Sequence, residues 1–161
     1  ERVLQFMRLW EDRRGSSIVE MTFVTPFLIF LGLGLAEFGQ ALYHQHLITT
    51  GLRDSARYLA RFDDPLSAAA DGRALAATGQ ITGGTNRVSW WGAGNVTVTV
   101  SNVANPIDAN TGQRQYRGGD NISIVRAATN VNHPGLGFLS LLGIASPLQI
   151  NVAHEERVIG D

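Results

Sequence analysis

An uncharged apolar segment near the start of the chain constrains its fold more than any other feature. The segment, residues 21–36, reads MTFVTPFLIFLGLGLA, and as a helix it would measure about 24 Å. The flanking residues extend it across a hydrocarbon core of roughly 30 Å, provided that Glu20 and Glu37 are tolerated. A buried core helix is the alternative, but a small domain rarely hides so continuous an apolar run. We therefore predict a transmembrane helix over residues 16–43.

A removable secretory signal peptide is a second alternative, because basic residues precede the apolar segment. After the segment, however, residues 37–43 read EFGQALY, which contains no small-residue cleavage site and continues the helical pattern. The helix should therefore stay attached as an anchor. Arg13 and Arg14, directly before the segment, favour a cytoplasmic N-terminus, although Arg53 and Arg57 lie on the other side of it.

The composition limits the kind of domain that the anchor can carry. A chain of 161 residues with 44% hydrophobic content suits one small domain and one anchor. The net charge is -1, and no stripe of Lys or Arg suited to a phosphate backbone is present, so nucleic acid is not expected as a partner. The chain has no cysteine, which excludes disulfides, a Cys nucleophile and thiolate metal sites.

The junction before the apolar segment, residues 13–20, reads RRGSSIVE and is the most specific motif in the chain. It resembles a prepilin peptidase recognition site, with basic residues, a glycine and then a glutamate at the apolar end of a helix. Gly15 has no side chain, so its backbone can enter a protease cleft in an extended conformation. Cleavage after Gly15 would leave Ser16 as a new, positively charged N-terminus. Residues 1–15 would form a basic cytoplasmic leader, and because the sequence starts at Glu1 we expect the natural leader to be longer.

Two acids and one proline interrupt the apolar helix. A carboxylate in an apolar helix is costly unless it is paired, and the Ser16 amine of a neighbouring subunit is a suitable partner for Glu20. Glu20 is therefore predicted to act in assembly; the alternative is a carboxylate at the membrane interface, where the helix macrodipole favours it. Pro26 removes a backbone donor and should loosen the helix one turn above Glu20. Glu37 is a candidate second acid within the membrane or at its interface.

An ordered set of short motifs occupies the same stretch of chain. The motifs are Arg14-Gly15, Val19-Glu20, Pro26, Glu37-Phe38-Gly39, Tyr43 and Ala56-Arg57-Tyr58. Together they make residues 13–61 resemble the TadE-like family of minor pilins or pseudopilins, which belong to tight-adherence (Flp-type) pilus systems. Met21 departs from the pattern, since the family often has an aromatic residue after the glutamate.

The resemblance implies a structural or assembly subunit of a bacterial type IV pilus system. Its location would be the inner membrane, crossed once, with a cytoplasmic N-terminus and a periplasmic or extracellular C-terminal domain. The implied partners are a prepilin peptidase that cuts after Gly15, other pilin-like subunits, the inner-membrane assembly platform and the lipid bilayer. The competing function is an uncleaved single-pass anchor that presents a small β-rich binding module.

The helical pattern continues beyond the membrane segment to about Phe62, with charged residues on the opposite side. The Asp-Asp-Pro sequence at residues 63–65 should end this helix. Residues 66–78 are rich in alanine and predict a second helix that Gly79 stops. The residues that recur at helical spacing on the apolar side are Ile48, Leu52, Ser55, Ala56 and Leu59.

The rest of the chain predicts strands separated by loops rich in Asn, Gly and Asp. The predicted fold class is α+β: a long N-terminal transmembrane helix that continues into a small domain, residues 44–161, with an antiparallel β-sheet. The predicted strands cover residues 86–91, 96–101, 121–129 and 148–157, with core candidates Ile122, Ile124, Leu148, Ile150 and Val152.

An apolar, glycine-rich segment, residues 134–146, precedes the last strand. It is too short to span a membrane, and it is similar to an apolar loop at the same place in the TadE-like family. A short core helix is one interpretation. The other is a surface that meets another subunit or the lipid.

No residues form a recognisable catalytic frame, so we predict that the protein is not an enzyme and needs no metal or cofactor. The histidines are scattered, and His44 and His46 lie on different faces of a helix. Residues 108–112 are spaced like part of a calcium loop but lack its closing glutamate, which favours a turn. Trp90 and Trp91 could form an exposed binding pair, although one inward and one outward ring is the usual outcome in a strand.

Overall fold

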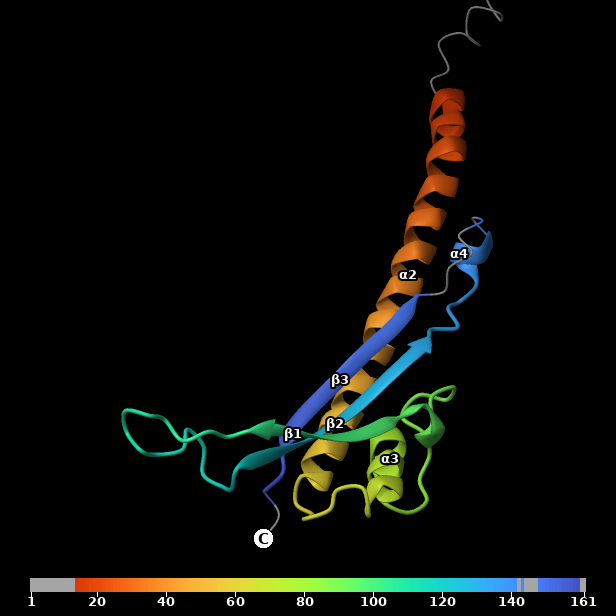
Figure 1. Cartoon of the computed structure of the whole chain (residues 1–161). Coiled ribbons are helices and arrows are strands. Elements are labelled where there is room, and N and C mark those ends of the chain that lie inside the picture. Colours follow the sequence, from red (N-terminus) through yellow and green to blue (C-terminus); the bar gives the residue numbers. More distant parts are fainter. Residues whose placement is uncertain (1–13, 142, 144–147, 160–161) are drawn as a thin grey trace, which may run out of the picture. The chain divides into compact units, whose positions relative to one another are not determined.

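The computed structural model describes residues 14–141, 143 and 148–159 (Figure 1). The leader up to Arg13, and Ile144 and Ser146 of the apolar loop, lie outside the described residues. Contacts between residues divide the described chain into two compact units. We call them the helical unit, residues 14–39 with 136–141 and 143, and the sheet unit, residues 40–135 with 148–159.

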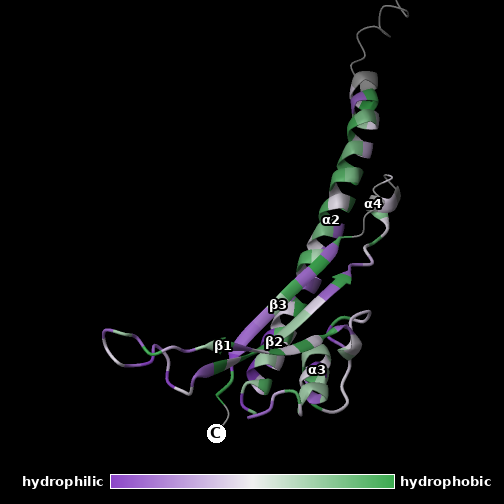
Figure 2. Cartoon of the chain, in the orientation of Figure 1, coloured by the Kyte–Doolittle hydropathy of each residue, from purple (hydrophilic) through white to green (hydrophobic). Residues whose placement is uncertain are grey.

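Helix α2 (Arg14–Leu59) contributes to both units. Pro26 lies within α2 without ending it. Over Ser17–Leu59 the helix is long and apolar enough to cross a membrane, and it is the one helix of this kind in the described part of the chain. Figure 2 shows hydrophobic residues along most of its helical-unit part. The predicted long apolar helix is therefore confirmed, whereas the predicted domain boundaries after residues 15 and 43 stay predictions.

Helix α2 ends at Leu59, just before the predicted end near Phe62. The amides of Arg61 and Phe62 donate to carbonyls three residues back, so the chain leaves the helix through tighter turns. The side chain of Asp64 then accepts the N–H of Leu66 at 3.0 Å, which starts a turn instead of a helix.

The second predicted helix is α3 (Ala69–Thr78), which begins three residues later than expected. It ends as predicted at Gly79, whose φ of 80° is left-handed and whose N–H donates to the Leu75 carbonyl at 2.8 Å. Two glycines let α2 and α3 approach closely: a Cβ at Gly51 would lie 2.2 Å from the Ala76 carbonyl oxygen, and one at Gly72 would meet the Leu59 side chain at 2.7 Å.

The sheet unit contains one antiparallel sheet with the strand order β1-β2-β3. Residue Val98 of β1 pairs with Ala127 of β2, and Val125 of β2 pairs with Glu156 of β3. This sheet confirms the predicted α+β fold. The strands are β1 (Thr97–Ala104), β2 (Asn121–Asn132) and β3 (Gln149–Arg157).

The two faces of the sheet have different environments. One face packs into the core of the sheet unit, while the other carries exposed polar residues such as Thr99 and Arg126. Ile124 is half-buried and lies outside the core, because it precedes Val125 and therefore points to the opposite face. All five predicted apolar-side residues of α2 are fully buried. The central core residues are Ile48, Leu52, Ala56, Leu59, Trp91, Val98, Val125, Ala127 and Ile150.

The strand predicted over residues 86–91 is wrong. This segment forms a tight turn with an isolated bridge between Val88 and Trp91, and the 3₁₀ helix η1 (Ala93–Asn95) comes directly after it. Its backbone hydrogen bonds do not go to a neighbouring strand, since the Arg87 N–H donates to the Ala77 carbonyl in α3 at 2.7 Å. Val88 and Trp91 of this segment are both buried in the core of the sheet unit, and the Trp91 ring is 0% exposed.

Candidate functional site

The predicted cleavage and assembly residues lie at the start of α2. Gly15 and Ser16 are helical, since α2 begins at Arg14. Every residue from 17 to 33 is exposed in the single chain, including Glu20 and large apolar residues such as Phe23, which is 78% exposed. Exposed apolar surface of this extent is unfavourable in water. This part of the helix therefore requires apolar surroundings that the described chain does not itself supply.

Pro26 makes this exposed helix locally irregular. Because proline has no N–H, the Thr22 carbonyl loses its usual helical donor. The Thr22 hydroxyl in turn donates to the Ile18 carbonyl at 2.8 Å. One backbone acceptor within the two turns after Ser17 therefore lacks its helical N–H donor. A shallow, open hollow surrounds this point, lined by Ser17, Ile18, Met21, Thr22, Thr25 and Pro26.

Glu37, the second predicted acid, has a different environment from Glu20. Its side chain is buried, with the residue only 3% exposed. One carboxylate oxygen, Oε1, accepts the backbone N–H of Leu136 at 3.2 Å. Glu37 therefore ties the apolar loop to α2 within the helical unit.

An aromatic contact continues this attachment. Phe138, in the short helix α4 (Phe138–Leu141), lies with its ring centroid 5.7 Å from that of Phe30. A Cβ at Gly34 would lie 3.7 Å from the Phe138 ring, so the glycine leaves the ring room against the helix. Phe30, Gly34 and Glu37 share one face of α2 by their spacing. That spacing was visible in the sequence, but nothing in the sequence identified the partner of the face.

A second cluster, in the sheet unit, was missed by sequence reasoning. His44 of α2 and His133, 1% exposed after β2, lie with Nδ1 and Nε2 2.8 Å apart. The Trp90 ring contacts both imidazoles edge-on, at centroid distances of 5.7 and 5.5 Å. The two histidines are 89 residues apart in the chain, so no local spacing could have indicated the pair.

The backbone fixes the tautomers of this pair. The N–H of Gly135 can only donate, and it points to Nδ1 of His133 at 2.9 Å. Nδ1 of His133 is therefore the acceptor, and the proton of a neutral ring lies on Nε2, which donates to Nδ1 of His44. This directional chain of hydrogen bonds links α2 to the segment directly after β2.

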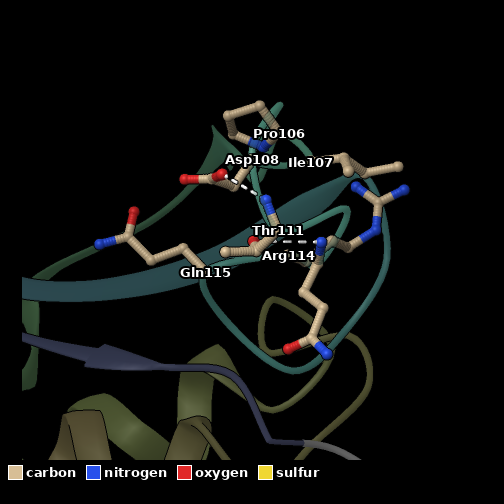
Figure 3. Close-up of a pocket in the computed structure, with 7 residues that line it drawn as sticks. Pro106, Ile107, Asp108, Thr111, Arg114 and Gln115 are labelled. Atoms are coloured by element: carbon tan, nitrogen blue, oxygen red, sulfur yellow. Dashed lines mark hydrogen bonds between the residues drawn. The ribbon is translucent and has the colours of Figure 1, made fainter.

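The connection between β1 and β2 lines an open hollow of about 460 Å³ (Figure 3). Asp108 at its edge accepts the N–H groups of Asn110 and Thr111, as expected for a turn rather than a calcium loop. The hydrogen bonds from the Thr111 and Asn110 backbones lower the pKa of the Asp108 carboxyl. Arg114 donates to the Asn105 carbonyl at 2.6 Å and pairs with Asp120, which holds the long loop in one shape.

Metal ligands do not gather in the described part of the chain. Over residues 14–141, 143 and 148–159, no group of three His, Cys, Asp or Glu residues is placed to hold a metal ion.

The comparisons with known proteins match part of the chain to a family model. The model of the TadE-like protein family matches residues 15–57, which confirms the predicted resemblance over that segment. Neither the search of curated proteins nor the search of solved structures found a match. The family suggests a pilin-like subunit associated with a tight-adherence pilus, and the apolar helix within the matched segment suggests a membrane anchor.

Proposed function

We propose that this chain, which matches the TadE-like family over residues 15–57, is a membrane-anchored assembly subunit of a bacterial tight-adherence type IV pilus system. The observation that carries the proposal is the exposure of apolar side chains around the whole helix from residue 17 to 33. A helix that is hydrophobic on all sides belongs in lipid or in a bundle of similar helices. A pilin-like subunit uses both surroundings in succession.

The proposed topology is a single pass through the inner membrane. The basic residues Arg13 and Arg14 precede the apolar segment, and positive charges favour the cytoplasmic side. The sheet unit then lies on the periplasmic side, and no catalytic role is assigned to it.

The proposed processing step is cleavage by a prepilin peptidase after Gly15. Because Gly15 and Ser16 are helical here, the peptide bond must leave the helix before it enters a protease cleft. Unwinding is least costly at a glycine, which destabilises a helix by about 1 kcal/mol relative to alanine. Cleavage turns Ser16 into the N-terminal residue with a charged amine.

The proposed assembly step pairs this amine with Glu20 of a neighbouring subunit. Glu20 lies among exposed apolar residues, so assembly into a helical bundle would remove its carboxylate from water. A buried charge requires a partner of opposite sign. The Thr22 carbonyl, which lacks a helical N–H donor because of Pro26, is a second candidate acceptor for an incoming amine.

The experiment compares Glu20→Gln with Glu37→Gln in the cell that makes the pilus. Mass spectrometry first checks that both variants are inserted and begin at Ser16. We expect Glu20→Gln to lose co-purification with the pilus complex, because roughly 2 to 5 kcal/mol per contact is lost when an amine is left unpaired in an apolar bundle. Glu37→Gln is the matched control, since its amide keeps an oxygen to accept the Leu136 N–H.

Two results would contradict the proposal. A mature N-terminus beyond Glu20 would exclude the processing step. Normal co-purification and normal numbers of surface pili with Glu20→Gln would remove the assembly role. The uncleaved anchor that presents a binding module would then be the better account.

A further inference from the structure

The apolar loop before β3 is attached to α2 within the helical unit, and nothing in the proposed function uses it. Its described residues, 136–141 and 143, include no charged residue. Phe138 packs against Phe30 of α2 and is 9% exposed, whereas Leu136 is 57% exposed. The loop thus contacts the helix through Phe138 and carries an exposed apolar residue, Leu136.

Three polar groups of the loop donate hydrogen bonds within the helical unit. The Leu136 N–H donates to Glu37, the Ser140 hydroxyl donates to the Gly137 carbonyl at 2.7 Å, and the Gly143 N–H donates to the Ser140 carbonyl at 3.0 Å. Hydrocarbon cannot replace such bonds, so backbone groups at membrane depth must find partners within the protein. A loop that docks on another subunit has no such need, because the partner can supply donors and acceptors.

The backbone lets the chain reverse within a few residues. Gly137 and Gly143, on either side of α4, have φ values of 88° and 75°, which other residues rarely adopt. The segment can therefore enter and leave an apolar layer without spanning it. Phe138 meets α2 at Phe30, which by helical rise lies about 10 Å along the axis from Glu37 toward the N-terminus.

We propose that residues 136–141 and 143 dip into the outer leaflet of the bilayer beside α2 and form a second lipid-contacting element. Glu37 is the positioning residue, since its carboxylate holds the loop at Leu136. The lipid is favoured over a second subunit because Phe138 packs on the part of α2 whose apolar side chains are exposed, and the exposed residue of the loop, Leu136, is apolar as well. This inference rests on the membrane span of the proposed function, but not on cleavage at Gly15 or on the role of Glu20.

The test uses the absence of cysteine from the chain, which lets a single cysteine carry a fluorophore. The full chain with Leu136→Cys is labelled and placed in nanodiscs that hold one copy each. Ile107→Cys is the matched control, because Ile107 is also apolar and 57% exposed but lies in the sheet unit. Phe23→Cys, in the exposed part of α2, reports the membrane span itself. Nitroxide-labelled lipids quench probes in the bilayer, and iodide quenches probes in water.

We expect the probe at position 136 to lose fluorescence to nitroxide lipid as the probe at 23 does, with blue-shifted emission, while iodide quenches only the probe at 107. Quenching at 136 by iodide overturns the inference, and so does protection from both quenchers. A loop that docks on a second subunit would behave differently in two ways. The free cysteine at position 136 would cross-link between two copies, and the labelled cysteine at 136 would be open to iodide in single-copy discs. Failure of lipid to quench the probe at 23 would instead overturn the membrane span.

Two further variants separate the role of Glu37 from a general loss of structure. In the Leu136→Cys background, Glu37→Ala removes the acceptor of the Leu136 N–H, and we expect a red shift and new iodide quenching at position 136. Glu37→Gln keeps an acceptor oxygen and should retain the lipid signal. Equal behaviour of the two variants would contradict the positioning role, while the probe at 23 checks that the helix remains inserted.

Discussion

The two parts of helix α2 show how one continuous element can require two different environments. In the helical unit its residues from 17 to 33 are all exposed and mostly apolar. In the sheet unit the same helix buries a narrow stripe that includes Ile48 and Leu52, while Arg53 and Arg57 remain exposed. The second part is an amphipathic helix whose apolar face the chain covers itself. The first part requires an apolar environment from outside the chain.

The acids of α2 illustrate the same difference. Glu37 lies where the covered stripe begins, and the chain supplies a backbone N–H for its carboxylate. Glu20 lies where the helix is exposed on every side. The Glu37 carboxylate is a structural attachment, whereas the Glu20 carboxylate lies on a surface that another molecule can reach. The difference teaches that burial by the chain's own residues, and not helix formation, separates the part of α2 that belongs to the folded sheet unit from the part that stays exposed.

The largest expected effect comes from the tryptophan at the centre of the sheet unit. Trp91 is 0% exposed, and its Nε1–H donates to the Thr129 hydroxyl at 3.1 Å. Trp91→Ala should lower the free energy of unfolding by about 4 kcal/mol through the cavity it leaves. Urea denaturation of the full chain in detergent, monitored by circular dichroism, measures the loss. Phe23→Ala is the control for the exposed part of α2, and a comparable loss there would contradict the comparison.

The next effect tests the close approach of α2 and α3. Gly51→Ala places a methyl group against the Ala76 carbonyl, which belongs to the backbone and cannot rotate away. We expect a loss of about 3 kcal/mol in unfolding free energy. Gly39→Ala in the same helix has open space around the new methyl group and should be neutral or slightly stabilising. If both variants behave alike in the denaturation experiment, the helices do not pack as the structure shows.

The sequence predicted the parts of the fold that have a strong local pattern. The buried stripe of α2 and the alternating β1 strand result from periods of 3.6 and 2 residues, and the left-handed turn at Gly79 results from the residue type. Residues 86–91 misled because their backbone does not pair with a strand: the Arg87 N–H donates to the Ala77 carbonyl of α3, and the Trp91 N–H donates to the Val88 carbonyl within the turn. Such tertiary contacts override the local preference for a strand.

The candidate site also contains residues that the sequence indicated and contacts that only the fold revealed. Gly15, Glu20 and Pro26 could be selected because they form a motif in adjacent turns. The hydrogen bond between Leu136 and Glu37 joins residues 99 positions apart in the chain. No pattern in the sequence indicates a contact over such a separation. Glu37 could therefore be recognised as unusual in an apolar helix, but its partner emerged only from the fold.

A smaller effect should result from breaking the histidine pair. His133→Leu leaves the Gly135 N–H and the His44 ring without their partner, so we expect a loss of about 2 kcal/mol. His46→Leu is the control, because this neighbour of His44 is exposed on another face of α2. A double-mutant cycle with His44→Leu, measured by urea denaturation, should give a coupling energy of about 1 kcal/mol. Additive losses would show that the rings do not interact.

The smallest effect concerns a pH-dependent contact between α2 and β3. His154 Nε2 lies 3.0 Å from Glu156 Oε1, and Arg57 Nε lies 3.4 Å from the same oxygen. The hydrogen bond from His154, together with the smaller contribution of Arg57, lowers the pKa of the Glu156 carboxyl from its ordinary value of 4.5. A lowered pKa means that the folded state favours the ionised carboxylate. The resulting stability is present above pH 4.5 and disappears as the pH falls through the lowered value.

Glu156→Gln should therefore lower the free energy of unfolding at pH 7 by no more than about 1 kcal/mol, because the pair is partly exposed and screened by water. The difference from the unaltered protein should shrink as the pH is lowered below 4.5, where the unfolded carboxyl also binds a proton. Glu155→Gln is the control, since Glu155 lies on the open face of the sheet beside Arg126 and away from α2. Denaturation series at several pH values give the slopes. A difference for Glu156→Gln that stays constant down to about pH 3 would show that packing, and not the charge, links β3 to this half of the helix.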